Sequence, residues 1–293
     1  MAILAVGGYS DRDWGSAMEP LFYCGEGNMD IRLSAIWQYP VKGIRGVLVD
    51  QALVEPAGLR FDRRWIIVDG QGKFVSQRSL PRLALISGDF YGSRLLLAAP
   101  GQTPLRLEVP AGDLRTEVSV WRDRIAGAAA DPSADRWLSE FLDHPCRLVY
   151  MDERCRRPIS SPGGRSGESV SFADGYPLLM ISAASLEDLN GRLEQPLPMD
   201  RFRPNLVVSG CEPFAEDRWE RLRIGQAVFR FAGLCPRCSV TTVDQATGAR
   251  NSEEPLRTLV GYRQTEQGVV FGVNLIPEVT GTIATGDQVT ILD

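Results

Sequence analysis

The chain has 293 residues, of which 44% are hydrophobic and 24% charged, and its formal net charge is -5. This composition is typical of a globular protein, and the length suffices for one large domain or two of ordinary size. The negative net charge argues against a nucleic-acid-binding protein. The sequence also lacks an apolar run of about 18 residues that could cross a membrane as a helix.

The counts of histidine and cysteine exclude several kinds of site. The chain has one histidine, His144, so a zinc site built from several histidines is impossible. A Ser-His-Asp or Cys-His enzyme would have to use His144, which precedes a proline and is more typical of a surface turn. The six cysteines are irregularly spaced and do not indicate a disulfide framework. Because no signal-peptide pattern opens the sequence, we expect a cytoplasmic protein in a reducing compartment.

The predicted elements begin after a stretch without periodicity. Residues 1–29 contain glycine pairs, a proline and scattered aromatic residues, and we expect a weakly ordered leader in which Cys24 has no role. Short hydrophobic segments then follow one another closely. Strands are predicted at 31–37, 47–49, 64–68, 73–75, 85–90, 94–97, 105–109, 116–121 and 146–150, with a hairpin turn at 69–72. Many short strands at close spacing favour a small β-barrel or a sandwich.

Two helices and a loop interrupt these strands. The first helix is predicted over 131–142, where Asp131 is the capping residue and Pro132 follows it. The second is predicted over 185–193, with Ser185 and Asp188 in a spacing similar to a capping box. Between them, 154–169 is rich in Arg, Ser, Gly and Pro and predicts a linker or mobile loop. Further strands are predicted at 205–208, 220–224, 227–231, 239–243 and 289–292.

The segment 235–238 (Cys-Pro-Arg-Cys) carries the most distinctive chemistry. It places two thiols and a guanidinium before the hydroxyl-rich residues 239–242. A thiolate suits thiophilic metals and arginine binds phosphate oxygens, so the segment suggests a metal centre carried by a phosphorylated cofactor. Three alternatives remain open: half of a zinc site, which needs two more ligands; a thioredoxin-like redox pair, which prefers a helix N-terminus to the strand predicted here; and burial of the thiols as small hydrophobic groups.

Basic residues in other segments could hold an anion. In the extended segment predicted over 200–205, Arg203 and Asn205 would point the same way at the strand period and form an anion clamp. A solvated, salt-bridged strand end is the alternative. Lys42 and Gly43 lie in a turn where an ammonium and a backbone N–H could both meet a phosphate.

Two further segments add a guanidinium and a carboxylate. The segment 62–65 places Arg63 at the start of a predicted strand. The segment 171–177 places Asp174 in a turn before another strand, although most such aspartates only form turns. Each of these signals is weak alone.

Taken together, these segments resemble the MOSC superfamily, named for the C-terminal domain of molybdenum-cofactor sulfurase. The motifs stand in the family's order and span about residues 30–292: 39–43 (YPVKG), 62–65 (DRRW), 172–177 (FADGYP), 201–205 (RFRPN) and 235–244 (CPRCSVTTVD). The chain is similar to the subgroup with an N-terminal β-barrel, which includes the mitochondrial amidoxime-reducing component and bacterial proteins that detoxify N-hydroxylated bases. The resemblance implies a mainly β fold with a few helices, in which an N-terminal β-barrel at 30–150 packs on a MOSC β-barrel domain at 151–293.

The resemblance also implies a molybdenum cofactor, in which molybdopterin holds the metal. Cys238 would be the protein ligand to molybdenum and a catalytic residue, and Asp174 would lie near the metal and order it or transfer protons. The pterin and its phosphate would be held by Lys42, Gly43, Arg63, Arg203, Asn205 and Arg237. Gly43 stands where some relatives have serine, and 175–176 replaces a hydroxyl pair of others, so the side-chain contacts of those relatives could not form. Cys211 and Cys235 receive no role.

The activity that the resemblance implies is the reduction of N-hydroxylated small molecules to the amine. Some bacterial relatives carry a C-terminal iron–sulfur domain, but this sequence has no four-cysteine cluster signature. We therefore expect an external electron-transfer protein of the ferredoxin, flavin reductase or cytochrome b5 type. Neither a nucleic acid nor a membrane is expected as a partner.

The alternative to an enzyme is a carrier of molybdenum cofactor or of sulfur without turnover of its own. The sulfurase branch makes this reasonable, and a sulfur carrier would form a persulfide on Cys235 or Cys238. In that branch the domain accompanies a pyridoxal-phosphate desulfurase, which this sequence lacks, so pyridoxal phosphate binding is an association of the superfamily only. A third interpretation is a structural barrel that binds zinc at 235–238.

Overall fold

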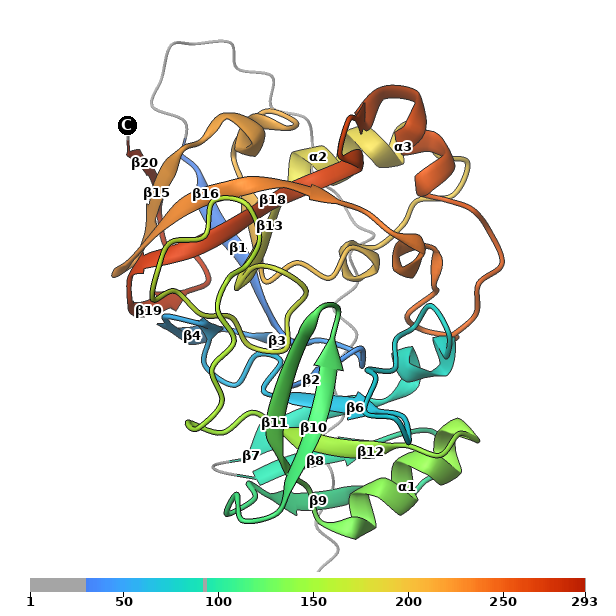
Figure 1. Cartoon of the computed structure of the whole chain (residues 1–293). Helices are drawn as coiled ribbons and strands as arrows, with labels where there is room; N and C mark the ends of the chain where they lie inside the picture. The colour runs from blue at the N-terminus through green and yellow to red at the C-terminus, as the bar shows by residue number, and fades with distance from the viewer. Residues whose placement is uncertain (1–29, 92–93, 293) are drawn as a thin grey trace, which may run out of the picture.

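Strands make up much of the described chain, and they lie in four sheets (Figure 1). The computed structural model describes residues 30–91 and 94–292, so the leader predicted over 1–29, with Cys24, lies outside the described residues. The largest sheet has the strand order β20-β15-β16-β18-β13-β14-β1-β3, with β17 paired to β18. The other sheets have the orders β10-β11-β12-β6-β2, β19-β4-β5 and β7-β8-β9. The prediction of a mainly β fold with a few helices is confirmed.

The strands of the largest sheet are β1 Arg32–Gln38, β3 Val47–Val49, β13 Leu178–Ser182, β14 Leu206–Ser209, β15 Arg221–Ile224, β16 Ala227–Pro236, β17 Gln264–Thr265, β18 Gly268–Val279 and β20 Val289–Leu292. Those of the second sheet are β2 Val41–Lys42, β6 Trp65–Val68, β10 Arg115–Val120, β11 Asp123–Ala129 and β12 Arg147–Tyr150. The smaller sheets contain β4 Gln51–Glu55, β5 Gly58–Leu59, β19 Gly281–Ala284, β7 Ser87–Tyr91, β8 Arg94–Ala98 and β9 Leu105–Glu108.

The helices are short, and each α-helix packs against an inner strand of a sheet (Figure 1). The α-helices are α1 Pro132–Leu142, α2 Ala183–Asn190 and α3 Leu256–Arg263. The 3-10 helices are η1 Pro81–Leu85, η2 Met199–Arg201, η3 Ala215–Arg218 and η4 Ser239–Thr242. No helix within the described ranges is long and apolar enough to span a membrane.

The first described strands belong to the same sheets as the last ones. β1 pairs antiparallel with β14, with Ile36 opposite Leu206, and β4 pairs antiparallel with β19, with Ala52 opposite Ile283. These strands bury their apolar side chains in one core with those of β13, β15, β16 and β18. Hydrogen bonds thus join the two halves of the chain across the boundary predicted at residue 150, and the position of that boundary stays a prediction.

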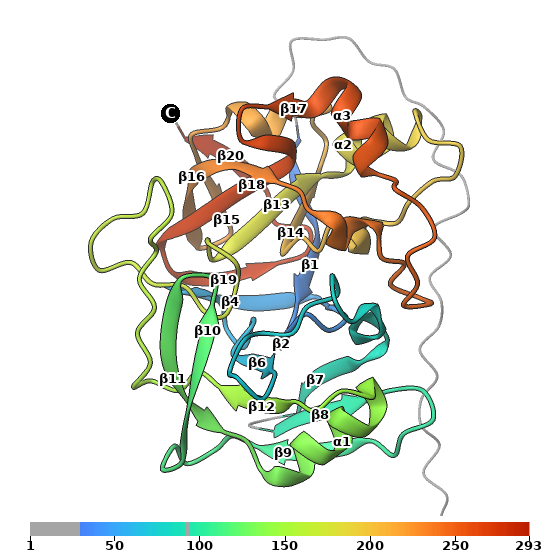
Figure 2. The same cartoon turned by 45° about the vertical axis from the view of Figure 1, so that its right-hand side comes forward.

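A second core lies in the lower part of the molecule as drawn in Figure 2. We call this part, with the sheets β10-β11-β12-β6-β2 and β7-β8-β9 and helix α1, the lower body, and the part built on the largest sheet the upper body. It contains side chains of β6 and β8 and the apolar face of α1. Asp131 caps α1 by accepting a hydrogen bond from the Ser133 backbone N–H at 2.8 Å, and Pro132 suits the first turn because it has no N–H to satisfy. The buried positions are spaced by three and four residues: Ala134, Trp137, Leu138, Phe141 and Leu142. The helix predicted over 131–142 is therefore confirmed within one residue.

The second predicted helix is displaced, and the cap was wrong. Helix α2 begins at Ala183, and its capping residue is Ser182, whose hydroxyl accepts from the Ser185 N–H at 3.1 Å. The Ser185 hydroxyl instead donates to the buried Glu216 carboxylate at 2.8 Å. Because this partner of Ser185 lies 31 residues further on, the spacing of Ser185 and Asp188 could not show that the Ser185 hydroxyl is engaged elsewhere.

The strand predicted over 239–243 is wrong, because these residues form the 3-10 helix η4. The hydroxyls of Thr241 and Thr242 donate to the carbonyls of Cys238 and Ser239, at 2.9 and 2.8 Å. Such local hydrogen bonds offer the backbone an alternative to the strand ladder, and here they prevail over the β propensity of threonine.

Two other extended segments differ from prediction. Residues 199–201 form η2, and Arg203 has a left-handed backbone with φ of 57°, so it does not follow the strand alternation expected to align it with Asn205. The strand predicted over 73–75 is reduced to isolated bridges at Lys73 and Phe74.

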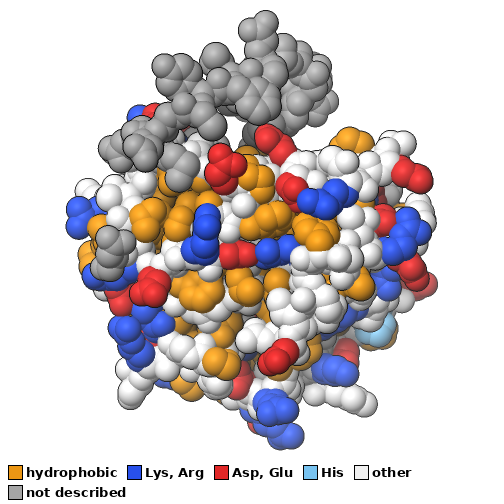
Figure 3. All heavy atoms as spheres, turned by 90° about the horizontal axis from the view of Figure 1, so that it is seen from above, with side chains coloured by type: hydrophobic (Ala, Val, Ile, Leu, Met, Phe, Trp, Pro, Cys, Tyr) orange, Lys and Arg blue, Asp and Glu red, His pale blue; other side chains and the backbone are white. Residues whose placement is uncertain are grey.

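The hairpin of β10 and β11 rises from the lower body toward the upper one, as both views show (Figures 1 and 2). Trp121 lies in its turn, between the paired residues Val120 and Asp123. Viewed from above, the upper body has acidic and basic side chains interspersed among hydrophobic ones (Figure 3).

Candidate functional site

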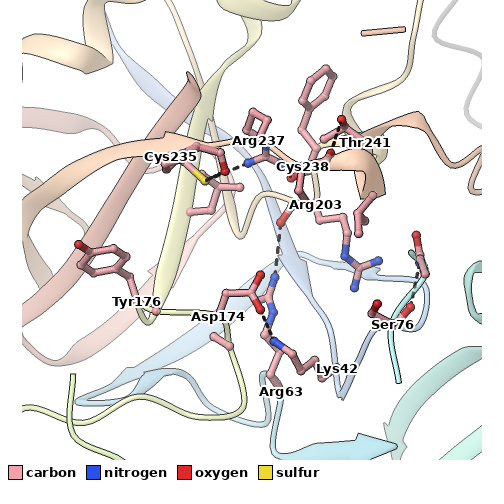
Figure 4. A pocket seen from close by; sticks show the side chains of 18 of the residues that line it. Lys42, Arg63, Ser76, Asp174, Tyr176, Arg203, Cys235, Arg237, Cys238 and Thr241 are labelled. Atoms are coloured by element: carbon pink, nitrogen blue, oxygen red, sulfur yellow. Dashed lines mark hydrogen bonds and ion pairs between the residues drawn. The ribbon is translucent and has the colours of Figure 1, made fainter. Parts of the chain in front are cut away.

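A pocket lies where the two bodies meet, and it contains about 940 Å³ of space between protein atoms, part of it open to solvent. Residues from five segments line it, within 42–43, 74–78, 173–179, 202–205 and 235–241, together with Arg63 and Asn274. All the predicted site residues line this pocket: Lys42, Gly43, Arg63, Asp174, Arg203, Asn205, Arg237 and Cys238. Figure 4 shows Lys42, Arg63 and Asp174 on one side of the open space and the segment 235–238 on another.

Lys42 and Asp174 form an ion pair in the pocket, with 2.5 Å between Nζ and Oδ1. The same Oδ1 accepts a hydrogen bond from the indole N–H of Trp121 at 3.2 Å. Desolvation works to raise the pKa of Asp174, but the Lys42 ammonium and the Trp121 N–H outweigh it and hold that pKa well below its usual range. Burial lowers the pKa of Lys42, and Asp174 opposes this shift. The carboxylate is therefore ionised and faces the pocket with 69% of its side chain accessible.

Tyr39 holds two arginines of the pocket in place. The guanidinium groups of Arg63 and Arg203 each lie 4.4 Å from the centroid of the Tyr39 ring. The phenol donates to the Pro204 carbonyl at 3.0 Å, and the Tyr39 N–H donates to Asp62 at 2.8 Å. The ring therefore spaces two positive charges at the floor of the pocket while its own polar groups are satisfied.

Arg203 has an unused donor. Its Nη1 is buried and has no hydrogen-bond partner among the described residues. Burial beside another cation lowers the pKa of this guanidinium to about 10, so it still carries its charge at neutral pH. A buried, charged donor without an acceptor is costly, and an anionic ligand would satisfy it.

Asn205 is engaged within the protein. Its Oδ1 accepts from Arg63 at 3.1 Å and from the Leu179 N–H at 3.3 Å, and its Nδ2 donates to the Trp37 carbonyl at 3.2 Å. Arg63 also pairs with the buried Asp62. In this structure Asn205 therefore positions Arg63 and ties β14 to β1, and its predicted contact with a cofactor stays a prediction.

The two cysteines of the CPRC segment lie in different surroundings. Cys238 is exposed and occupies the N-cap position of η4 without a capping hydrogen bond from its side chain, whereas Cys235 is half-buried and accepts a hydrogen bond from Arg237 Nη1 at 3.1 Å. Burial raises the pKa of the Cys235 thiol, although Arg237 opposes the shift. Arg237 is itself held by the Phe202 carbonyl at 2.6 Å. Cys238 is thus the more accessible of the two thiols and the better placed to bind a metal from the pocket.

The left-handed backbone of Gly43, with φ of 93°, explains why glycine suits this turn. Its carbonyl accepts from Gln77 at 2.8 Å, and Gln77 and Gln245 exchange side-chain hydrogen bonds at 2.9 and 3.1 Å. Both glutamines are almost fully buried. They join the lower body to the segment that follows η4, and nothing in their sequence context indicated this role.

Arg157 is a second residue that the sequence analysis missed. It lies in the predicted mobile loop, yet it is only 3% exposed. It donates to the carbonyls of Ser171 and Ala173 and to the Asp174 carbonyl, at 2.8, 2.5 and 2.6 Å, and pairs with Asp123 at 2.7 Å. Arg157 therefore fixes the turn that carries the Asp174 carboxylate. The run of arginines near 154–157 was the available signal, but it does not distinguish the buried one.

These residues fit a phosphorylated cofactor that carries a thiophilic metal. The pocket offers the free donor of Arg203 for a phosphate and the exposed Cys238 thiol as a soft ligand. A zinc site would need further ligands, and no group of three His, Cys, Asp or Glu side chains gathers in 30–91 and 94–292. The zinc interpretation of 235–238 therefore gains no support.

Comparisons with known proteins identify the family of the chain. Residues 30–145 match the MOSC N-terminal beta barrel domain, and residues 167–290 match the MOSC domain. The chain is 36% identical to mitochondrial amidoxime-reducing component 1 of Homo sapiens over 278 residues, which cover 89% of this chain and 82% of that protein. It is 35% identical to molybdenum cofactor sulfurase of Oryza sativa subsp. japonica over 267 residues, which cover 84% of this chain but 32% of that protein. The chain therefore belongs to the MOSC-domain proteins that carry an N-terminal MOSC β-barrel domain.

Proposed function

We propose that the protein is a molybdenum-cofactor-dependent oxidoreductase that reduces N-hydroxylated small molecules with electrons from an external donor protein. The observation that carries the proposal is the exposed Cys238 thiol in a pocket with the unpartnered, buried Arg203 donor. The amidoxime-reducing relatives support it, since the chain covers 82% of the human component 1. A cytoplasmic location and a donor of the ferredoxin, flavin reductase or cytochrome b5 type stay predictions.

The residues divide into two groups by what they would hold. Arg203, Arg63 and Arg237 would bind the phosphate and pterin of the cofactor by charge-assisted hydrogen bonds. Cys238 would ligate molybdenum through its thiolate. The bound cofactor supplies the two-electron chemistry by which an N–OH group, two electrons and two protons become an N–H group and water.

The ion pair of Lys42 and Asp174 is suited to manage the protons of this reaction. Lys42 Nζ holds a proton beside the Asp174 carboxylate, and burial makes that proton more acidic than usual. Lys42 would donate it to the departing hydroxyl, and Asp174 would stabilise the ammonium until then. The Trp121 N–H would keep the carboxylate oriented in both protonation states of Lys42.

The second candidate is a carrier of molybdenum cofactor or sulfur. The similarity to a molybdenum cofactor sulfurase favours it. The match covers 84% of this chain and 32% of that protein, so the chain would correspond to one part of the sulfurase. In this case a persulfide would form on Cys235 or Cys238. Tight binding of the cofactor without turnover under any electron donor would support the carrier over the enzyme.

The test is to purify the protein from a host that makes molybdenum cofactor, and to measure bound molybdenum, pterin fluorescence and the reduction of an amidoxime with an artificial electron donor. We expect metal, pterin and turnover in the wild type. We expect Cys238→Ala to lose molybdenum and Cys235→Ala to retain most of it. Equal loss of metal in both variants would contradict the assignment of the ligand, and wild-type protein without metal or pterin would contradict the proposed function.

A further inference from the structure

An aromatic pair, of which Phe74 lines the pocket, holds a pocket arginine, Arg78, that the cofactor assignment does not use. Phe74 and Trp121 meet edge to face, with ring centroids 5.2 Å apart. The Arg78 guanidinium lies 4.8 Å from the centroid of the Trp121 ring and 5.9 Å from that of Phe74. Its Nη1 is 3.8 Å from the sulfur of Cys238. A permanent positive charge therefore lies beside the proposed metal ligand, held on two aromatic rings.

Arg78 differs in its charge pairing from three other arginines of this part of the molecule. Arg63, Arg157 and Arg201 each pair with a carboxylate, at Asp62, Asp123 and Asp244. In the described part of the chain no carboxylate lies within ion-pair distance of Arg78, although it is half-buried. Among the described residues its charge is therefore not neutralised by an ion pair.

The backbone that presents Arg78 is well anchored. The Arg78 carbonyl accepts from Arg250 at 3.2 Å, and the preceding Gln77 is buried and hydrogen-bonded to Gly43 and Gln245. A side chain on such a segment is held at the pocket by its neighbours, as a recognition residue requires.

Trp121 has features that packing alone does not explain. Its backbone is left-handed, with φ of 57°, which is unfavourable for a large side chain, and 52% of the residue is exposed. The hairpin turn places its ring between two groups of the pocket, because the indole N–H reaches Asp174 while the ring face contacts Arg78. Strain of this kind is concentrated at sites where geometry serves function.

The charges in this region favour an anion. Lys42 neutralises the Asp174 carboxylate, whereas no carboxylate among the described residues pairs with Arg78. The Arg78 guanidinium also covers the aromatic face that would otherwise attract a cation. Phe74 lines the pocket and contributes apolar surface to it, and the Lys42 ammonium lies 5.2 Å from the centroid of its ring.

We infer that Arg78, held against Trp121 and Phe74 beside Cys238, forms a substrate subsite that binds a negatively charged substituent of a planar aromatic substrate. The inference rests on the proposed function for the identity of the reacting N–OH group, but the charge preference of the subsite does not. The protein would select substrates with an anionic group remote from the reacting nitrogen over those with a cationic group.

The first test compares two substrates that differ only in remote charge, benzamidoximes with a 4-carboxylate or a 4-aminomethyl group, on the cofactor-loaded protein at low salt. We expect kcat/KM to favour the carboxylate by about tenfold, which corresponds to about 1.4 kcal/mol. Arg78→Gln should abolish the preference and Arg78→Lys should retain most of it. The matched control is Arg82→Gln, because Arg82 stacks on Phe141 at 4.7 Å but does not line the pocket.

The second test measures binding without turnover, by calorimetry with benzamides that carry the same two substituents. Wild-type protein should bind the 4-carboxylate about tenfold more tightly, and Arg78→Gln should bind both alike at an unchanged Tm. This charge preference without any amidoxime reduction would retain the subsite and contradict the proposed function. Equal binding of the two analogues by the wild type, binding of neither, or an equal effect of Arg82→Gln would overturn the subsite.

Discussion

Replacing Arg157 by methionine tests the view that one buried arginine fixes the turn bearing Asp174. Methionine keeps an unbranched side chain of similar length but donates no hydrogen bonds. The substitution leaves Asp123 without its partner and removes the donors of the carbonyls of Ser171, Ala173 and Asp174. The turn would lose the contacts that hold its backbone.

The expected loss of stability is large for a single substitution. Breaking a buried ion pair by removing one partner costs about 3–5 kcal/mol, because the remaining charge and the freed acceptors stay poorly solvated. Arg157 is 3% exposed and the Asp123 side chain is 27% exposed, so water can reach the carboxylate in part and the lower end of that range applies. At this chain length a loss of about 3 kcal/mol lowers Tm by about 5 °C.

The assay is thermal unfolding followed by circular dichroism, with Arg156→Met as the matched control. Arg156 is the neighbouring residue and is exposed, and its Nη1 donates to the Glu153 carbonyl at 2.8 Å. The control should change stability by no more than about 0.5 kcal/mol. Arg157→Lys should recover part of the loss by keeping the pair with Asp123. If Arg157→Met and Arg156→Met unfold within about 2 °C of each other, the buried network does not hold the turn as we argue.

Three other predictions follow from the same contacts. Tyr39→Phe removes the phenol that donates to the Pro204 carbonyl but keeps the ring between the arginines, so denaturant unfolding should show a loss of about 1 kcal/mol; a loss above about 3 kcal/mol would contradict this reading. In native, cofactor-free protein at pH 8, iodoacetamide should modify the exposed Cys238 well before Cys211, because burial and nearby carboxylates raise the pKa of Cys211 to about 11. Mass spectrometry of digests shows the order of modification, and faster modification of Cys211 would refute the prediction. Because the folded-state pKa of Asp174 is depressed, its ionisation stabilises the fold above the unfolded-state pKa of about 4, and this contribution is lost as pH falls further. The Tm difference between wild type and Asp174→Asn should therefore be constant from pH 7 to 5 and shrink below about pH 4. A difference that grows on acidification would reverse the sign we assign.

Much of the secondary structure follows from local sequence. Helix α1 was predicted within one residue because its cap and its apolar spacing lie within the helix itself. The prediction failed at α2 and η4, where side-chain hydroxyls decide the backbone. Ser185 bonds to Glu216, which is distant in sequence, and the threonines of η4 bond to their own preceding turn. Propensity and periodicity register neither kind of hydrogen bond.

Some features of the candidate site are likewise indicated by the sequence, and others depend on the tertiary structure. The sequence by itself indicated the residues that could hold a phosphorylated cofactor and a soft metal, because guanidinium, ammonium and thiol groups have their chemistry wherever they lie. It also indicated the family, through five motifs in order. The family match over most of the chain agrees with that interpretation.

Only the tertiary structure decided how these groups are used. It separated Cys238, which is exposed, from Cys235, which is bonded to Arg237. It also stacked Arg78 on Trp121, a residue 43 positions away in the chain. The physical reason is that exposure, charge pairing and ring stacking depend on long-range packing. A local sequence pattern does not indicate which distant side chain becomes the contact partner.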